Sequence, residues 1–369
     1  MKRPIERIST AQLRMLAGGV FTGTVFLPIS SALARQAGSD STVALIVSML
    51  LAAILAYFVI HPAILRFPRL GLAEQFRLAF GGLLGRVLAA VIAISLYGFS
   101  ACLARQIADV YIVSLMPRTP IWVFAGPVLF LAAMMAREGV EVLVRYTAVV
   151  FPIILLTLLA IIGLTMTSIS LANFLPLFEN GLVGPAQAVA TGFMYAGEMV
   201  VVIWALVPAI NQPRGANFAI LSGAALAAVA LVGINFVTIG IFSAPEVARL
   251  FYATIDLSKT IQSGGYVRGV ESIVIGIFSA ASVLKVSAFL LAGSVILADV
   301  FGLQDYRALT LPAAALALVG VVRLHDPATM QRLLDGIDRV IMLPAFIVLP
   351  PLVRVLAVWR SRKRGTSVA

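Results

Sequence analysis

Three ionisable residues interrupt long apolar stretches of the sequence: Arg105, Glu198 and Lys285. A charge at the centre of a membrane helix costs about 2.5–3.5 kcal/mol on insertion scales, so such residues normally face a partner or a cavity. Glu198 could bind an amine, a cation or a proton, and Lys285 could occupy a cation's place or exchange a proton. The alternative is a structural ion pair between Glu198 and Lys285.

Arg105 has a possible partner on its own helix. Asp109 follows four residues later, and residues with this spacing face one another along a helix. The alternative for Arg105 is a contact with a substrate or another membrane span. Arg105, Asp109, Glu198 and Lys285 are therefore the predicted network for charge or proton coupling.

No combination of residues indicates enzymatic chemistry, such as a Ser-His-Asp, Cys-His or paired-carboxylate arrangement. Cys102 is the only cysteine, and the two histidines, His61 and His325, each lie near the end of an apolar stretch. One cysteine permits neither an internal disulfide nor a thiolate metal cluster. We therefore expect no enzyme, no cofactor and no metal site.

The composition is that of an all-α integral membrane protein. Hydrophobic residues make up 61% of the chain and charged residues 12%, against roughly 45–50% and 25% in soluble domains. Apolar stretches of about 18 to 28 residues are long enough to cross the hydrocarbon core as helices. We expect about ten spans in a single transmembrane domain, at 11–36, 42–66, 87–116, 120–136, 143–168, 183–209, 217–243, 269–298, 306–323 and 334–358.

The basic residues indicate the orientation. Most of the 27 Lys and Arg residues fall in the loops that are cytoplasmic if the N-terminus is inside, which predicts that both termini are cytoplasmic. Their scatter over several loops does not favour nucleic-acid binding. We expect the basic tail, residues 360–364, to lie at anionic membrane lipids, where each charge contributes about 1 kcal/mol.

Two glycine-containing stretches occupy matching positions in the predicted halves, 11–168 and 183–358. Residues 18–24 precede Pro28 in the first span, and residues 192–198 precede Pro208 in the sixth. Interrupted helices at matching positions are typical of inverted-repeat transporters, with the substrate at the breaks. Alternatively, Gly19 and Gly23 form a helix-packing contact. Helices one and six are thus predicted to be broken.

The residues at and near these breaks are predicted to bind the ligand, with Phe21 as further apolar lining. The predicted ligand-binding residues are Thr22, Gly23, Thr24, Tyr97, Tyr195, Gly197 and Glu198.

The loop before the eighth span has helical signals of its own. Ser243 could cap a helix, and Pro245 and Glu246 suit its first turn. Apolar residues then follow helical spacing as far as Ile261. This predicts one amphipathic outer helix, which is either a lid over an external vestibule or an interfacial helix.

Several stretches, in order and spread from Ile8 to Arg354, together resemble the B subunits of spore nutrient-germinant receptors. This family lies within the amino acid-polyamine-organocation (APC) transporter superfamily. The matching stretches are Ile8–Leu13 with Phe26–Pro28, Leu103–Arg105 with Met116–Pro120, Arg137–Glu141 with Arg145 and Pro152, Leu175–Gly181, Gly197–Met199 with Pro208, and Arg268–Ser272 with Lys285. The sequence departs from the family pattern in being rich in Ala and Arg, and in having Asp109 where Glu is more common.

The resemblance implies a LeuT/APC-like fold of five plus five helices in the inner spore or cell membrane. It also implies a subunit that binds a nutrient, often an amino acid, and triggers germination with an A subunit and a lipoprotein C subunit. A proton-coupled amino-acid permease acting on its own remains the alternative, with Glu198 or Lys285 exchanging the proton. An ion or water pathway through the same cavity is a third possibility.

Overall fold

The computed structural model describes residues 7–23, 28–179, 181–261, 270–323 and 326–363. Thr24 and His325 fall outside these ranges. The described chain is helical, and its one isolated bridge joins Ile8 and Ile210. The helices are α1 (Thr10–Thr22), α2 (Ile29–Ala37), α3 (Ser41–Leu55), α4 (His61–Ile64), α5 (Leu72–Phe80), α6 (Gly82–Ser114), α7 (Trp122–Glu138), α8 (Val140–Thr165), α9 (Val183–Ala205), α10 (Pro213–Phe242), α11 (Ala244–Val247), α12 (Ala253–Thr260), α13 (Val270–Phe301), α14 (Arg307–Arg323), α15 (Pro327–Ile337), α16 (Leu343–Ile347) and α17 (Leu349–Lys363).

Six helical runs in the described chain are long and apolar enough to cross a membrane, or seven with the pair Arg332–Ile347 and Leu349–Arg360, which is bent by 45°. Helices α7 and α14 have 17 residues each, and α1 and α2 lie on either side of residues 24–27. The order of the helices follows that of the predicted spans. The chain is an all-α, multi-pass integral membrane protein.

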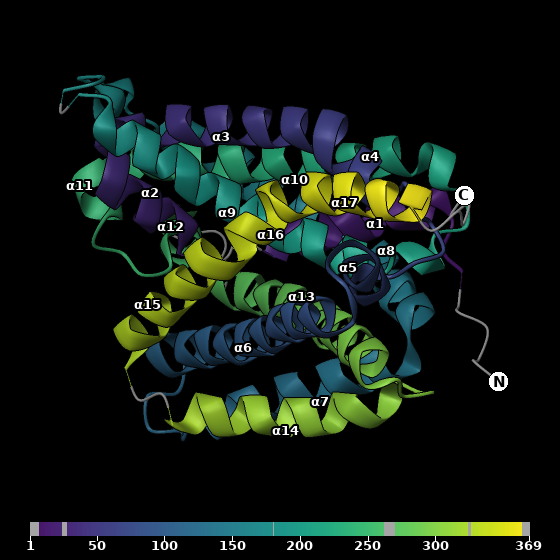
Figure 1. Ribbon diagram of the computed structural model, residues 1–369. Coiled ribbons are helices and arrows are strands. Elements are labelled where there is room, and N and C mark those ends of the chain that lie inside the picture. Colours follow the sequence, from purple (N-terminus) through teal and green to yellow (C-terminus); the bar gives the residue numbers. More distant parts are fainter. Residues whose placement is uncertain (1–6, 24–27, 180, 262–269, 324–325, 364–369) are drawn as a thin grey trace.

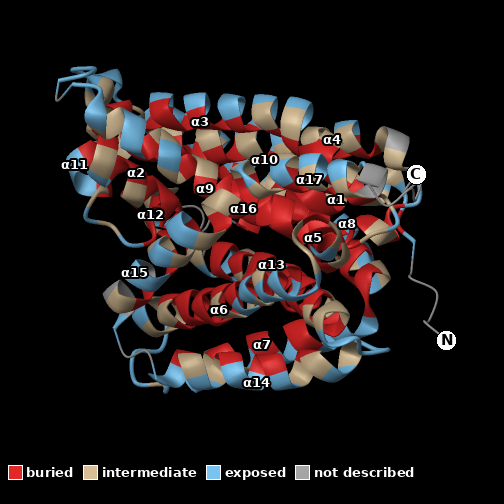
Figure 2. Ribbon diagram, in the orientation of Figure 1, coloured by how far each residue is buried: buried red, intermediate tan, exposed pale blue. Residues whose placement is uncertain are grey.

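The packing separates a buried interior from an apolar outer surface. In Figure 2 the helices in the middle of the bundle are mostly buried, whereas the outer helices expose one side. The exposed side chains are large and apolar, including Leu50 (59% exposed), Phe58 (70%), Leu156 (67%) and Leu316 (71%). Such surfaces suit lipid and not water.

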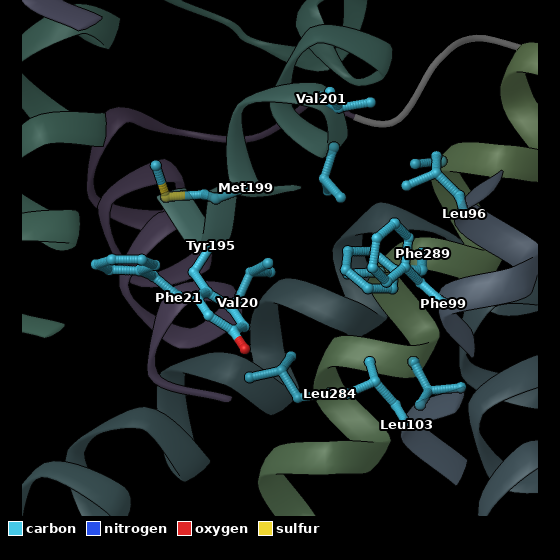
Figure 3. Packing of buried hydrophobic residues seen from close by; sticks show 14 of the residues in the cluster. Val20, Phe21, Leu96, Phe99, Leu103, Tyr195, Met199, Val201, Leu284 and Phe289 are labelled. Carbon is cyan, nitrogen blue, oxygen red and sulfur yellow. The ribbon is translucent and has the colours of Figure 1, made fainter. Parts of the chain in front are cut away.

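The interior is formed where α1, α6, α9 and α13 meet (Figure 3). Phe99 of α6 and Phe289 of α13 pack with their ring centroids 5.7 Å apart. On the other side of this contact, Val20 of α1 lies near Tyr195 of α9, whose hydroxyl points toward Leu284 of α13 (Figure 3). These four helices therefore position the buried polar residues described below.

The segment before α1 is bound to the segment that follows α9. The Ile8 N–H donates to the Ala209 carbonyl (2.8 Å), and the Asn211 N–H donates to the Ile8 carbonyl (3.0 Å). Ser9 and Gln12 then form a capping box that begins α1. The start of α1, the helix α5 and the end of α17 lie at one end of the bundle, and α2, α11 and α12 lie at the other (Figure 1).

The predicted break in the sixth span is wrong. Helix α9 runs without interruption from Val183 to Ala205, through both Gly192 and Gly197. The two glycines instead permit close packing, because a Cβ at Gly192 would lie 2.8 Å from the Ser48 Cβ, and one at Gly197 would lie 3.0 Å from the Phe346 Cβ. A glycine within an apolar helix is thus as consistent with a tight helix contact as with a break.

The single outer helix is also wrong. The segment forms two short helices, α11 and α12, and Ser243 has φ of 65° and makes no capping bond. Helix α11 is held against α2, where Arg35 Nη1 donates to the Ala248 carbonyl (3.1 Å). The Tyr252 hydroxyl donates to the Gln106 carbonyl on α6 (3.0 Å). The segment is therefore bound to two different helices, α2 near the end of α11 and α6 at the start of α12.

His61, near the end of the second predicted span, lies in the protein interior. Its side chain is fully buried, and its Nδ1 lies 2.7 Å from Asn217 Oδ1 of α10. Asn217 Nδ2 donates in turn to the Tyr57 carbonyl (3.3 Å). His61 therefore joins α4 to α10 through a buried polar contact.

Candidate functional site

The centre of the site is an ion pair between α13 and α9. Lys285 Nζ lies 2.6 Å from Glu198 Oε2, and the two side chains are 1% and 3% exposed. The same ammonium is 5.7 Å from the centroid of the Phe289 ring, close enough for a cation–π interaction. The ion pair between Glu198 and Lys285, which the sequence offered as the alternative to a ligand or proton contact, is therefore present within the buried interior.

The end of α1 packs directly on this pair. Gly23 follows the last residue of α1, and a Cβ at this position would lie 3.0 Å from the Lys285 Cδ and 3.2 Å from its Cβ. Any larger residue at Gly23 would have to displace the Lys285 side chain. The first predicted helix interruption thus lies beside the predicted charge pair.

Three other predicted ligand-binding residues lie on α1 and α9, the helices that contact Lys285. The Thr22 hydroxyl is buried and donates to the Gly19 carbonyl (2.9 Å), so it already has a partner within α1. Tyr195 lies one turn before Glu198 on α9 and is 7% exposed. Gly197 packs against Phe346 of α16, whose Cβ would lie 3.0 Å from a Cβ at this position.

A second buried carboxylate, Asp338, was missed by the sequence reasoning. It is 5% exposed and begins the π-helical turn Asp338–Met342. Its carboxylate interacts electrostatically with Glu198 and Lys285, and with Asp335 on α15. The sequence placed Asp338 near the start of the last span, beside Asp335 and Arg339, where charges usually mark the membrane interface.

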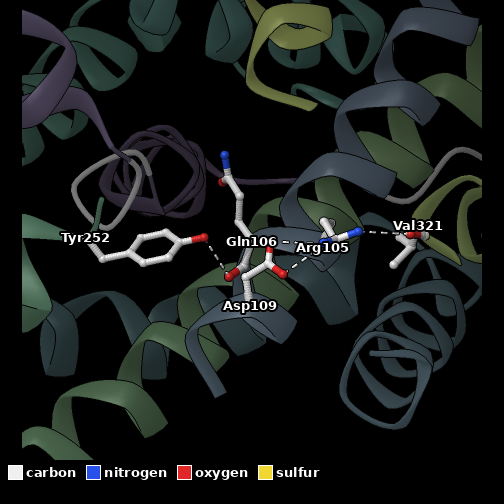
Figure 4. Close-up of polar contacts among 5 residues, drawn as sticks. All are labelled: Arg105, Gln106, Asp109, Tyr252 and Val321. Carbon is white, nitrogen blue, oxygen red and sulfur yellow. Dashed lines mark hydrogen bonds and ion pairs between the residues drawn. The ribbon is translucent and has the colours of Figure 1, made fainter. Parts of the chain in front are cut away.

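Arg105 and Asp109 form a separate network on α6 (Figure 4). Arg105 Nε donates to both oxygens of Asp109, at 2.9 and 3.0 Å, and its Nη1 donates to the Val321 carbonyl of α14 (3.4 Å). The expected pair four residues apart is therefore present. Its contact with α14 gives Arg105 a structural role in joining two helices.

Gln106 lies next to this network and was also not anticipated. Its carbonyl accepts the bond from Tyr252, while its side-chain Oε1 is buried and has no hydrogen-bond partner among the described residues. Burial and the nearby Asp109 charge raise the pKa of Tyr252 well above its ordinary value, so the phenol remains a donor at neutral pH. This bond fixes the start of α12 on α6.

Tyr97 is not part of the group around Lys285. Its hydroxyl is 3.0 Å from the Ser294 hydroxyl on α13, and a Cβ at Gly293 would lie 2.7 Å from its ring. Ser294 is more than two helical turns beyond Lys285, about 13 Å along α13. The structure thus places Tyr97 away from the ion pair.

A cavity of about 530 Å³ opens at the end of the bundle that contains α5. Its lining includes residues of α5, the end of α9 and the last turns of α13, among them Glu74, Pro208, Leu291 and Asp299. Leu291 is about 9 Å along α13 from Lys285. The cavity therefore extends from this end of the bundle toward the ion pair.

The fold defines the class of protein. The structure of Mhp1, described as a nucleobase-cation-symport-1 family transporter in a closed conformation with bromovinylhydantoin bound, matches with a TM-score of 0.64 over 100% of this chain and 92% of that chain, at 14% identity. A Na⁺-coupled sialic acid symporter in a substrate-bound outward-open state matches with a TM-score of 0.67 over 91% and 79%, at 10% identity. The fold is that of LeuT-type transporters.

The family follows from the sequence. The sequence model of the family described as "Spore germination protein" matches residues 7–327. This chain therefore belongs to that spore germination permease family.

Two proteins of Bacillus subtilis (strain 168) are similar to this chain. "Spore germination protein YndE" is 20% identical over 269 residues, which are 72% of this chain and 73% of YndE. "Putative spore germination protein YfkT" is 35% identical over 143 residues. That second match spans 37% of each chain.

Proposed function

We propose that this chain is the nutrient-binding subunit of a germinant receptor, and that it binds a small nutrient, specifically an amino acid, at the Glu198–Lys285 pair. The observation that supports this most directly is the end of α1 at Gly23, packed on a buried ion pair in the interior of a transporter fold. Helix ends and paired charges at such a position are the usual means by which this fold class binds a polar ligand.

The ends of α1 and α2 suit the two charges of an amino acid. The carbonyl end of a helix carries partial negative charge and attracts an ammonium, and the amino end carries partial positive charge and attracts a carboxylate. Helix α1 ends at Thr22, and α2 begins at Ile29 with no side-chain capping bond from Pro28. In our proposal the first N–H groups of α2 bind the carboxylate of the amino acid.

Sensing requires that the ligand favour one of two conformations. The inner cavity opens at the α5 end, whereas α11 and α12 contact α2 and α6 at the other end. In our proposal the α11–α12 segment acts as a lid at the outer end, and both termini are cytoplasmic. Nutrient binding shifts the balance between open and closed forms, and the A subunit and the lipoprotein C subunit respond to this shift.

A proton-coupled amino-acid permease is the second candidate. The observation in its favour is that both similar solved structures bear the names of symport-type transporters, and that this chain has a buried acid–base pair where coupling could occur. The two candidates use the same pocket, so they differ in whether the bound ligand crosses the membrane.

The proposal is tested in spores in which the chain carries Gly23→Leu. The added side chain must displace Lys285, so we expect at least a tenfold higher nutrient concentration for half-maximal germination. Gly276→Leu on α13 is the matched control, because nothing lies within 4 Å of a Cβ at Gly276. Unchanged responses in Gly23→Leu spores with a normal membrane level of the protein would contradict the proposal.

A further inference from the structure

Asp338 is a buried carboxylate that lacks a hydrogen-bond partner for one of its oxygens. Its Oδ1 accepts no hydrogen bond from any described residue, and the residue is 95% buried, given an exposure of 5%. Burying an ionised carboxylate without a partner is very costly, so such a group normally binds a cation or a proton. The π-helical turn at Asp338–Met342 is of a kind that occurs frequently at functional sites.

The charges around Asp338 do not balance. Its carboxylate interacts electrostatically with Glu198 and the Tyr195 phenol of α9, with Lys285 of α13 and with the Cys102 thiol of α6. On its own helical segment the nearby charge is Asp335, which is half-buried.

Lys285 already neutralises Glu198 through their 2.6 Å contact. If Asp338 were ionised as well, the buried group of Glu198, Lys285 and Asp338 would carry a net negative charge. Two carboxylates in one buried site normally resolve this by keeping one proton between them. A neutral carboxylic acid at Asp338 makes the group neutral overall.

We propose that Asp338 is a proton-binding site, occupied at neutral pH, and that the protonated acid completes the Glu198–Lys285 pair at the nutrient pocket. The inference adds a residue to the proposed nutrient site, but the proton does not depend on which nutrient binds. When the Asp338 proton leaves, the new negative charge competes with Glu198 for the Lys285 ammonium. Loss of the proton therefore weakens the ion pair on which Gly23 packs.

The test is infrared spectroscopy of the purified full-length chain in lipid nanodiscs at neutral pH, with no nutrient present. A protonated buried carboxylic acid gives a carbonyl-stretch band that an ionised carboxylate lacks. We expect this band in the wild type and its loss in Asp338→Asn. Asp256→Asn, which removes a half-buried carboxylate paired with Lys259, should retain the band.

A second measurement covers the case in which the band is obscured. Asn is neutral and has nearly the shape of protonated Asp, so Asp338→Asn should fold and should melt at or above the wild-type temperature. Its melting temperature should also change less than that of the wild type as the pH is raised. A band that persists in Asp338→Asn, or a large loss of thermal stability in this variant, would overturn the proposal.

Samples in which choline replaces sodium distinguish a proton from a metal cation. A band that appears only without sodium would show that Asp338 binds sodium, and would also overturn the proposal. Because no nutrient is used, these results are independent of whether the chain binds an amino acid. A failure of the proposed nutrient binding would instead appear in the Gly23→Leu spores.

Discussion

The Glu198–Lys285 ion pair is the central contact of the proposed nutrient site. With side chains only 1% and 3% exposed, each charge relies on the other, because the interior offers little solvation. Glu198→Gln should lower the free energy of unfolding by about 3–5 kcal/mol. Lys285→Met should cost more than Glu198→Gln, since it leaves Glu198 beside Asp338 without the ammonium.

Thermal and denaturant unfolding in detergent would measure these effects. The double variant Glu198→Gln/Lys285→Met should recover much of the lost stability, because it leaves no unpaired member of the ion pair. Additive losses in the double variant would contradict a direct interaction between the two side chains.

The Arg105–Asp109 pair should behave differently, since it joins α6 to α14 and is separate from the proposed ligand site. Asp109→Asn should lower stability by about 1–3 kcal/mol and leave the half-maximal nutrient concentration unchanged. Glu141→Gln is the matched control, because its pair with Arg145 has the same spacing but is exposed, and exposed pairs contribute little. A large change in nutrient response for Asp109→Asn would place this network in the ligand site.

At the scale of helices, the glycines of α9 act in packing. A Cβ at Gly192 would lie 2.8 Å from the Ser48 Cβ of α3, so Gly192→Ala should destabilise the protein by about 1–3 kcal/mol through overpacking. Adding Ser48→Gly should restore most of this loss in thermal unfolding experiments. A Gly192→Ala variant of unchanged stability would show that α3 and α9 do not approach so closely.

Helix α9 also shows which features could be predicted from the sequence and which could not. The all-helical membrane fold, the buried charges Glu198 and Lys285, and the Arg105–Asp109 spacing could be predicted, because charges in apolar stretches and helical periodicity are local properties. Whether Gly192 and Gly197 break α9 depends on Ser48 and Phe346, which are remote in sequence. Asp338 was missed for a similar reason, since its burial depends on packing against other helices.

At the scale of the whole molecule, the predicted topology can be tested by labelling. Single cysteines are introduced at Met116, which is 54% exposed, and at Glu138, which is exposed, after replacing Cys102 with Ala. An impermeant maleimide should label Met116→Cys in intact right-side-out vesicles, and Glu138→Cys only after permeabilisation. The reverse pattern would show that the termini are external. Cys102 is buried, so wild-type protein should remain unlabelled.

The central claim is that the chain binds an amino acid as a sensor in a transporter fold. The most direct test is binding and uptake of a panel of radiolabelled amino acids by proteoliposomes that contain the purified chain, with and without an imposed pH gradient. We expect saturable binding of at least one amino acid, abolished by Gly23→Leu, with no accumulation inside the vesicles. Gradient-driven accumulation would identify a permease. The absence of saturable binding across the panel would contradict the proposed nutrient-binding function.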